Sequence, residues 1–520
     1  MARLVYHRKK DTGVTYVYEI VEEHWDKEKK QMRSKQRCIG KLDPITNDLI
    51  PSKRLRNQKE VAEIGSATAK TTVSGHALIF NTIDKEIGLS NTLKKSCPDS
   101  FKQIISLAWY LASTGDPLSY ADSWCANHES PANGMLSSQR VSELLSKLSE
   151  GERQHFFKLW IKMIAEKDFL CYDISSISSY SKSNEYVKYG YNRDGEKLPQ
   201  INLGIVYGQN SCLPATYRQL PGSITDVTTV SNLLDMFNKL EYPKLHLVLD
   251  RGFYSQSNIT ELAKAGYNFT IGVPIHLNWI KERIDKLRDV IDSHECMNFV
   301  ETEPIYAHTS LMKWHETKRR CYLHIYYDEH KMAQDRTEFN RKLLTYKQEI
   351  ERDKRVPEHE EMYELFFTCR KTPKRGLKIK FNDEAINKAR KKYVGFSVVL
   401  STKLKEPIKA LQVYRDKDSI EKCFDDLKNG LDMKRLRVHD SSKMKSRLFI
   451  QFIALILVSQ TRKVMREKMP KSNYTVKSLL AEMESLTTIH YSGKYKSKMC
   501  EMTKNQREIL TAFDVEVSKL

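Results

Sequence analysis

Apolar residues recur every three to four positions between about residues 75 and 165, which predicts a run of helices. FKQIISLAWYLA (101–112) is typical of an apolar helix. SSQRVSELLSKL (137–148), in which Ser138 can act as the N-cap, is followed at once by SEGERQHFFKLWIKMI (149–164). These two segments predict a helix-turn-helix-like pair, whose role is either DNA contact or plain packing.

Alternating and continuous apolar runs predict strands in the rest of the chain. VTYVYEIVEEHW (14–25) and QMRSKQRCIG (31–40) flank a charged turn and predict a two-stranded ribbon with a basic second strand. From residue 168, three strand-like segments are followed by a helix, the strand LHLVLD (245–250), another helix and the strand FTIGVP (269–274). Strands followed by alternating helices and strands indicate an α/β core with a mixed sheet.

The pattern changes between residues 296 and 392. YLHIYYD (322–328) and YELFFTCR (363–370) predict strands on either side of a charged helix (331–354), and a strongly basic stretch follows them. YVGFSVVLS (393–401) then restores the strand pattern of the core. Residues 296–392 are therefore interpreted as a β-rich, basic insertion into the core.

A chain of 520 residues is expected to form two to four domains. The expected segments are a basic β-ribbon, a helical region that is a candidate for DNA end binding, the first part of the core, the insertion, and the second part of the core with C-terminal helices. Their bounds are 1–65, 66–165, 166–295, 296–392 and 393–520.

The charge balance favours a polyanionic partner. The chain has 86 Lys and Arg against 66 Asp and Glu, for a formal charge of +20, and nucleic acid is the simplest partner for such an excess. The ten cysteines include no C-x-x-C pair, so we expect reduced thiols in the cytoplasm. The first ten residues lack an apolar signal core, and LFIQFIALILV (448–458) is too short to span a bilayer of about 30 Å. A buried helix, and no membrane partner, is expected.

Three acidic residues have the character of metal ligands. Asp173 ends the apolar run FLCYD, Asp250 ends LHLVLD, and Glu421 lies in a helical stretch that Pro407 opens. Phosphodiester transfer requires stabilisation of both the attacking and the leaving oxygen, which two Mg²⁺ ions held by carboxylates provide. Taken singly, the aspartates are typical loop or capping residues and the glutamate a typical solvated side chain.

The helix around Glu421 adds a second signal. At about 100° per residue, Tyr414, Lys417, Glu421 and Lys428 fall within roughly 60° of arc, beside an apolar face. This stripe could bind a metal on its carboxylate and phosphates on its lysines. A solvent-facing row of ion pairs would have the same spacing, and the pattern alone does not separate the two.

The spacing Y-x2-K-x3-E-x6-K on these four residues resembles the Tyr-Arg-Glu-Lys signature of bacterial insertion-sequence transposases with an Asp-Asp-Glu site. Lys417 stands where that family usually has arginine, which keeps the charge but loses the bidentate fork. Further segments resemble blocks of the family's catalytic domain, so that the similarity extends from about 168 to 515. They are GYNRDGEKLPQINLGIVYG (190–208), LPGSITDVTTV (220–230), LDRGFYSQSNI (249–259), residues 393–424 and residues 435–457.

The resemblance implies a ribonuclease-H-like core with a largely β insertion between the second aspartate and the glutamate. It implies a DNA transposase that cuts the ends of an insertion sequence and joins them to target DNA. Asp173, Asp250 and Glu421 would be the catalytic metal ligands, holding Mg²⁺ or Mn²⁺, most simply two ions. The implied partners are double-stranded DNA with terminal inverted repeats, target DNA and a second copy in a homodimer, within the bacterial nucleoid.

Tyr414, Lys417 and Lys428 are then candidate DNA contacts. Arg251 and Arg437 are further candidates for DNA contact. For Arg251 a role in bracing the loop is about equally favoured, and for Arg437 a place in a solvated basic turn is nearly as favoured. Trp314 is the candidate for stacking on a flipped base, although a core tryptophan is the favoured interpretation. Asp226 matches a position of the family, but its place before a helix favours an N-cap.

Two other functions fit the same residues. One is an endonuclease on this core that hydrolyses DNA without joining it. The other is a DNA-binding protein derived from a transposase that has lost its chemistry, which the presence of all three acids disfavours.

Overall fold

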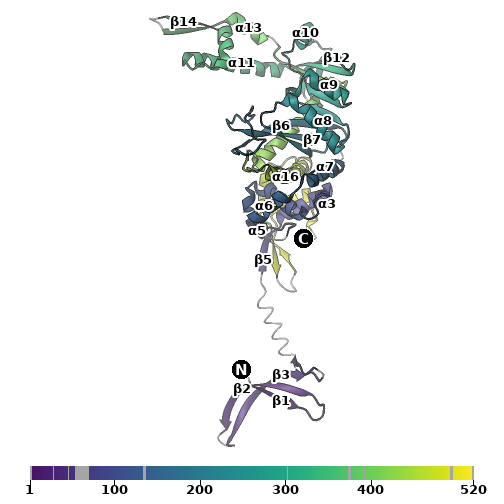
Figure 1. Cartoon of the computed structure of the whole chain (residues 1–520), viewed down its shortest axis with the longest axis vertical. Coiled ribbons are helices and arrows are strands. Elements are labelled where there is room, and N and C mark those ends of the chain that lie inside the picture. Colours follow the sequence, from purple (N-terminus) through teal and green to yellow (C-terminus); the bar gives the residue numbers. More distant parts are fainter. Residues whose placement is uncertain are drawn as a thin grey trace. The chain divides into compact units, whose positions relative to one another are not determined.

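The computed structural model describes residues 3–26, 29–44, 46–52, 69–132, 136–164, 166–300, 302–372, 376–391, 393–491 and 496–517 (Figure 1). The chain divides into two compact units. The smaller unit is Met1–Thr72 with Thr487–Glu501, and the larger unit is Val73–Leu486 with Met502–Leu520.

The smaller unit contains two sheets. The four-stranded sheet has the order β1-β2-β3-β4 with antiparallel neighbours, and the three-stranded sheet has the order β19-β18-β5. The predicted ribbon of 14–25 and 31–40 is confirmed as the β2–β3 pair and has two more strands. The strands are β1 (Leu4–Arg8), β2 (Thr15–Asp26), β3 (Gln31–Leu42), β4 (Leu49–Pro51), β5 (Ala69–Val73), β18 (Thr487–Tyr491) and β19 (Lys498–Met499).

A mixed ten-stranded sheet forms the centre of the larger unit, with the order β11-β12-β13-β16-β10-β9-β6-β7-β8 and with β17 paired to β6. Strand β6 is parallel to β9, which is parallel to β10, and the neighbours on either side run antiparallel. The strands are β6 (Phe169–Ser179), β7 (Gln200–Gly208), β8 (Pro214–Pro221), β9 (His246–Leu249), β10 (Asn268–Gly272), β11 (Met297–Val300), β12 (Glu303–Lys313), β13 (Arg320–Tyr327), β16 (Phe396–Ser401) and β17 (Arg435–Leu436). The predicted α/β core with a mixed sheet is confirmed.

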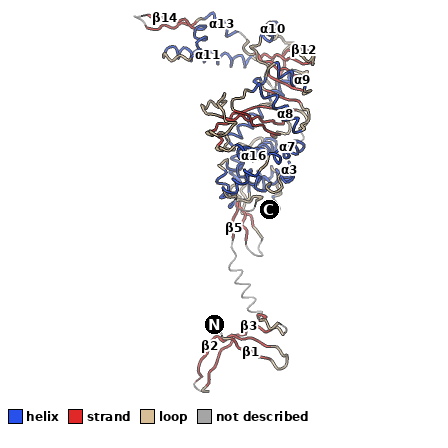
Figure 2. The backbone as a smooth tube through the Cα atoms, in the orientation of Figure 1, coloured by secondary structure: helices blue, strands red, loops and turns tan. Residues whose placement is uncertain are grey.

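The central strands read as continuous apolar runs because both of their faces are covered. Every residue of β7 and β9 is buried, as is usual for strands between two helical layers. Figure 2 shows the strands flanked by helices, and α14 (Pro407–Arg415) packs across β9, β10, β12 and β16. The other helices beside the sheet are α8 (Thr229–Leu240), α9 (Gln256–Lys264), α10 (Asn278–Leu287) and α15 (Asp418–Asp425).

A helical layer contains both early and late segments of the chain. The long helix α16 (Ser441–Lys468) packs against α2, α4 and α6, although these lie more than 250 residues earlier (Figure 1). Helix α16 is long and apolar enough to cross a membrane by length and composition, but 89% of its most apolar window is buried. The buried helix predicted at 448–458 is confirmed. The layer also contains α2 (Gly75–Ile87), α3 (Leu89–Ser96), α4 (Phe101–Thr114), α5 (Ala121–Asn127), α6 (Ser138–Lys147), α7 (Glu150–Ile164), α17 (Val476–Met483) and α18 (Lys504–Ala512).

The predicted helices at 101–112 and 137–164 are found as α4, α6 and α7. Ser137, one residue before the predicted Ser138, is the N-cap of α6, and its hydroxyl accepts a bond from the Arg140 amide. The apolar faces of α6 and α7 are buried, and Phe156 of α7 packs edge-on against Phe449 of α16, with ring centres 5.2 Å apart. Packing therefore accounts for the apolar pattern of this pair.

The prediction of a largely β insertion is wrong, because more of the described residues within 296–392 lie in helices than in strands. Strands β11 to β13 join the large sheet. The remainder, which forms its own apolar cluster, consists of α11 (Glu329–Glu351), α12 (Glu360–Phe366), β14 (Phe367–Thr372), β15 (Gly376–Phe381) and α13 (Asp383–Lys391). YELFFTCR was predicted as a strand, but it begins in α12 and becomes a strand only at Phe367. The prediction failed because such a short apolar run satisfies both the helix and the strand periodicity.

Candidate active site

Two of the predicted acids lie side by side in the large sheet. The parallel pairing of β6 with β9 ends at Tyr172 opposite Leu249, so the next residues, Asp173 and Asp250, are neighbours in register. Adjacent strands are about 4.8 Å apart. Asp250 follows β9, as predicted. Asp173 does not end its strand, because β6 continues to Ser179 and pairs with β7 and β17.

Asp173 lies in a crowded acidic environment. Burial, together with the negative charges of Asp250 and Asp226, raises the pKa of its carboxyl to about 6 against the opposing charge of Arg193. Arg193 donates hydrogen bonds to the Ile174 carbonyl and to the Asp226 carboxylate. Carboxylates grouped in this way take up protons unless a cation neutralises them.

Asp250 is held by side chains of the segment that follows β16. The Tyr414 hydroxyl donates a hydrogen bond of 2.9 Å to Asp250 Oδ1, and Lys417 Nζ lies 3.4 Å from the same oxygen. Burial alone would raise the pKa of Asp250, but Lys417, the Arg251 amide and Tyr414 outweigh burial and lower it. Asp250 is therefore ionised in the folded chain.

A glycine makes room for Tyr414 beside Asp250. A Cβ atom at Gly272 of β10 would collide with the Tyr414 hydroxyl and would lie 3.2 Å from Arg251 Cβ. The absence of a side chain at Gly272 allows α14 to lie across β10 with the phenol reaching Asp250.

Lys417 connects the second aspartate to the glutamate. Its Nζ atom lies 3.4 Å from Glu421 Oε1 as well as 3.4 Å from Asp250 Oδ1. The side chain of Glu421 is 61% exposed, whereas that of Lys417 is 18% exposed. One cation thus bridges two carboxylates that are far apart in the sequence.

The continuous helix predicted around Glu421 is wrong. Helix α14 ends at Arg415, α15 begins at Asp418, and a π-helical turn spans Asp426–Gly430. Lys417 lies at the break, immediately before α15. Asp418 and Glu421 occupy the first turn of α15, where their negative charges interact favourably with the positive end of the helix dipole.

The prediction that Lys428 belongs to one stripe with the other three side chains is consequently wrong. Lys428 Nζ lies 2.7 and 2.9 Å from the two carboxylate oxygens of Asp194, in the connection between β6 and β7. The break at Lys417 and the π turn change the angular relation that a regular helix would give. Tyr414, Lys417 and Glu421 do converge, through Asp250 and Lys417.

Asp226 is a fourth acid near the first two, and its interpretation as a helix N-cap is wrong. Neither Asp226 nor the preceding Thr225 makes a side-chain cap. The Asp226 carboxylate pairs with Arg193, and one of its oxygens would lie 3.1 Å from a Cβ at Gly252. The sequence signal for this placement was the position of Asp226 in LPGSITDVTTV, a segment that resembles a block of the family's catalytic domain.

Trp314 is a core residue. Its side chain is buried, and its indole N–H donates a hydrogen bond of 3.0 Å to Thr260 Oγ1. The favoured interpretation of Trp314 as a core residue is therefore confirmed, and its candidate role in stacking on DNA is wrong. Trp279, which no sequence pattern indicated, lines a cavity of about 680 Å³ together with Arg251 and Tyr254. Arg251 directly follows Asp250 in the chain.

The other predicted arginines lie at the surface. Arg251 is exposed at the edge of that cavity. The side chain of Arg437 is 59% exposed and lies 3.9 Å from Asp432.

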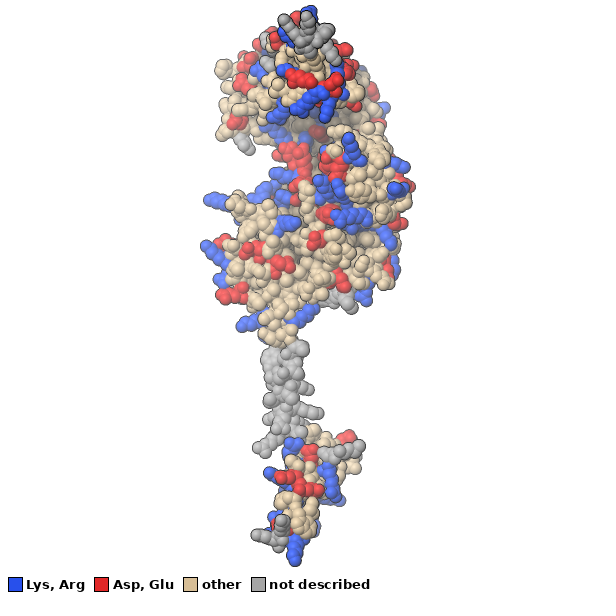
Figure 3. Space-filling view, turned by 90° about the vertical axis from the view of Figure 1, so that its left-hand side faces the viewer, with Lys and Arg blue, Asp and Glu red and all other residues tan. Residues whose placement is uncertain are grey.

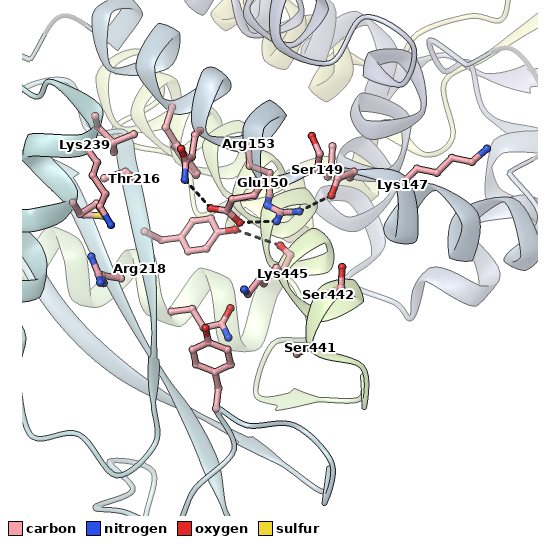
Figure 4. Close-up of a pocket in the computed structure, with 18 of the residues that line it drawn as sticks. Lys147, Ser149, Glu150, Arg153, Thr216, Arg218, Lys239, Ser441, Ser442 and Lys445 are labelled. Carbon is pink, nitrogen blue, oxygen red and sulfur yellow. Dashed lines mark hydrogen bonds and ion pairs between the residues drawn. The ribbon is translucent and has the colours of Figure 1, made fainter.

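A second cavity of about 680 Å³ lies between α7, β8, α8 and the start of α16 (Figure 4). Arg153, Arg218, Lys239 and Lys445 line it, and Arg153 pairs with Glu150 at 2.7 Å. None of the three predicted metal ligands lines this cavity. It is separate from the acidic site.

Comparison with known proteins identifies the family. The model of the family described as "Transposase DDE domain" matches residues 164–457, more than half of the chain. The chain belongs to this family and is, in general terms, a DNA transposase. No curated protein sequence matches it. One solved structure, the "piggyBac transposase synaptic complex with hairpin DNA", is 9% identical with a TM-score of 0.34, covering 79% of this chain and 70% of that chain.

Proposed function

We propose that this transposase cuts DNA at the ends of an insertion sequence and joins the ends to target DNA, with Asp173, Asp250 and Glu421 as its catalytic metal ligands. The observation that carries the proposal is the position of Lys417, 3.4 Å from a carboxylate oxygen of both Asp250 and Glu421. Asp173 adjoins Asp250 by the register of β6 and β9.

The strand order supports a ribonuclease-H-like core. The sub-order β8-β7-β6-β9-β10 combines an antiparallel β6–β7–β8 meander with two strands parallel to β6. In this core the segment between Asp250 and Glu421 contains the 296–392 insertion. The segment bounds predicted from the sequence belong to the same proposal.

The three acids fit divalent ions. DDE transposases generally use such ions, and Mg²⁺ and Mn²⁺ prefer the carboxylate oxygens that these residues offer. When bound, most simply as a pair, the ions would activate the attacking group and stabilise the leaving oxygen. The crowding that raises the pKa of Asp173 would be relieved by the same positive charge.

The chain's own residues would position the site and the DNA. Tyr414 orients the Asp250 carboxylate through its hydrogen bond. Lys417, which bridges two acids here, can pair with a phosphate once these acids are neutralised. Lys428 would act indirectly, by holding Asp194 and its loop beside the site.

DNA would follow exposed aromatic and basic side chains around the acids. Tyr189 and Tyr191, in the loop between β6 and β7, are 75% and 86% exposed and can stack on bases. Arg251 and Arg437 are exposed near the ends of the core segments. Figure 3 shows a hollow on one face of the molecule in which Asp and Glu side chains gather, with Lys and Arg side chains around it.

The finer identity is part of the proposal. The Tyr414, Lys417, Glu421 and Lys428 spacing supports a bacterial insertion-sequence origin with a variant of the Tyr-Arg-Glu-Lys signature. A homodimer on paired DNA ends and a nucleoid location in the cytoplasm follow from that origin.

Incubation with DNA carrying the inverted repeats that flank the gene, with Mg²⁺ or Mn²⁺, tests the function. The wild-type chain should give nicks at the repeat ends and joined products. Asp173→Asn, Asp250→Asn and Glu421→Gln should each abolish both while sparing DNA binding. Asp235→Asn, an exposed change on α8, should cut normally. Nicks without joining would identify a purely hydrolytic endonuclease, and binding without nicks an inactive derivative.

A further inference from the structure

A second group of potential metal ligands lies in the helical layer of the larger unit. His76 is in the first turn of α2, His128 directly follows α5, and Glu484 directly follows α17. Their ligand atoms all lie within 4.8 Å of one another. Among the residues that the structure describes, no other group of three His, Cys, Asp or Glu side chains meets this condition.

Each imidazole has one nitrogen occupied by a main-chain carbonyl. His76 Nε2 lies 2.9 Å from the Leu480 oxygen, and His128 Nδ1 lies 2.8 Å from the Trp124 oxygen. Because a carbonyl can only accept, these two nitrogens carry the protons. Once deprotonated, His76 Nδ1 and His128 Nε2 would offer lone pairs to a metal ion, and a carbonyl behind the ring is the usual support of a metal-binding histidine.

The other two ring nitrogens face the two oxygens of one carboxylate. His128 Nε2 lies 2.8 Å from Glu484 Oε1, and His76 Nδ1 lies 3.4 Å from Glu484 Oε2. A tetrahedral zinc site with bonds of about 2.0–2.1 Å has ligand atoms about 3.3 Å apart. The two spacings to Glu484 are therefore close to those of a zinc site.

The buried Nδ1 nitrogen of His76 has an ion-pair neighbour in Glu484 but no hydrogen bond within the described part of the chain. His76 is 1% exposed, and its Nδ1 atom has no hydrogen-bond partner among the described residues. A metal ion bound to Nδ1 would supply the contact that this buried atom lacks.

The rings are fixed in place by stacking. The rings of His76 and His128 lie 5.6 Å apart at 20°, and Trp124 stacks on His128 at 4.2 Å and 14°. The side chain of Glu484 is 51% exposed, which leaves an approach from solvent. Two preorganised nitrogens and an accessible carboxylate thus converge.

We propose that His76, His128 and Glu484 bind a zinc ion, separate from the catalytic acids, that ties α2, α5 and α17 together. Two imidazole nitrogens and one carboxylate suit Zn²⁺, whereas Mg²⁺ prefers an all-oxygen site. A fourth position is left for water, and no cysteine takes part. The proposal does not depend on the function of Asp173, Asp250 and Glu421.

Zinc titration of the chelator-treated full chain, without DNA and with an excess of Mg²⁺, tests the site. Calorimetry should show one tight Zn²⁺ per chain, with a rise of several degrees in the melting temperature. Co²⁺ in place of Zn²⁺ should give the visible absorption of a tetrahedral nitrogen–oxygen site. No tight Zn²⁺ binding to the wild-type chain would overturn the proposal.

Two variants identify the ligands without relying on activity. Glu484→Gln keeps the size and polarity of the side chain but removes its charge, and should weaken Zn²⁺ binding at least tenfold. His128→Gln should do the same, and Glu467→Gln, an exposed change on α16, should bind as the wild type does. The double variant Asp173→Asn with Asp250→Asn should retain the tight site. Loss of tight binding in that variant, with normal binding by Glu484→Gln, would place zinc at the acids and overturn the proposal.

Discussion

The Tyr414 hydroxyl donates a hydrogen bond to the Asp250 carboxylate across 164 residues of the chain. Lys417 contacts the same carboxylate and lies with its ammonium group 5.5 Å from the centre of the Tyr414 ring. This contact joins the segment after β16 to the end of β9. It fixes the orientation of the acid that we propose as a metal ligand.

Replacement of Tyr414 by Phe removes this hydrogen bond and leaves the ring in place. A hydrogen bond to a charged group contributes about 1.5–3 kcal/mol, which corresponds to roughly 10- to 150-fold in rate. We expect a loss of this size in single-turnover cleavage, with unchanged DNA affinity. Tyr120→Phe, at a side chain that is 65% exposed, is the matched control. Equal rates for Tyr414→Phe and wild type would show that the orientation of Asp250 does not depend on Tyr414.

Replacement of Gly272 by Ala tests the same contact from the opposite side. The added methyl group would meet the Tyr414 hydroxyl and Arg251 Cβ, so the phenol should move away from Asp250. We expect a loss of cleavage at least as large as that of Tyr414→Phe, measured in the same assay. Gly151→Ala meets only the Ser149 hydroxyl at 3.9 Å and, since alanine favours helices, should raise stability slightly. Full cleavage by Gly272→Ala would contradict the close approach of α14 to β10.

The raised pKa of Asp173 predicts a pH-dependent effect on stability. The pKa of about 6 in the folded chain exceeds the ordinary aspartate value of 3.8, because of burial and the charges of Asp250 and Asp226, which Arg193 only partly offsets. A raised folded pKa contributes stability below the unfolded pKa, and this contribution is lost as the pH rises through 6. In chelator-treated protein, Asp173→Asn should therefore raise the melting temperature more at pH 7.5 than at pH 5. The same shift at both values would contradict ionisation of Asp173 in this window.

Phosphate contacts should make DNA binding strongly dependent on salt. Lys378 and Lys380 of β15 lie on the basic hairpin of β14 and β15. Their double replacement by Ala should lower the slope of log affinity against log salt by about two, measured by fluorescence anisotropy. Replacement of Lys94 and Lys95 on α3 is the matched control. A salt-independent affinity of the wild-type chain would contradict a phosphate-based interface.

Much of the fold follows from local sequence patterns. The sequence predicted the helices α4, α6 and α7, the buried helix within α16 and the succession of strands along the chain from β6 to β10. Their apolar patterns are long and regular. The helical content of 296–392 was not predicted, because the apolar pattern of YELFFTCR is too short to distinguish a helix from a strand. Asp173 ends an apolar run but not its strand, because the polar residues after it stay buried through pairing with β7 and β17.

The site was predictable only in part for a related reason. Glu421 and Tyr414 could be grouped by helical spacing, but the break at Lys417 and the π turn at Asp426 depend on tertiary packing. The pairing of Lys428 with Asp194 and of Asp226 with Arg193 joins residues far apart in the chain. Trp314 and Trp279 differ in burial and not in any local pattern. No periodicity indicates such contacts.

Cleavage of the polypeptide by bound iron tests the central claim most directly. Fe²⁺ replaces Mg²⁺ in the complex with DNA ends, and peroxide then generates radicals that cut the chain next to the ion. The Glu484→Gln background keeps iron from the histidine cluster. Our account predicts cuts near residues 173, 250 and 421, all suppressed by excess Mg²⁺ and by Asp250→Asn. Cuts at one of these positions only, or at none of them, would contradict the convergence of the three acids on shared ions.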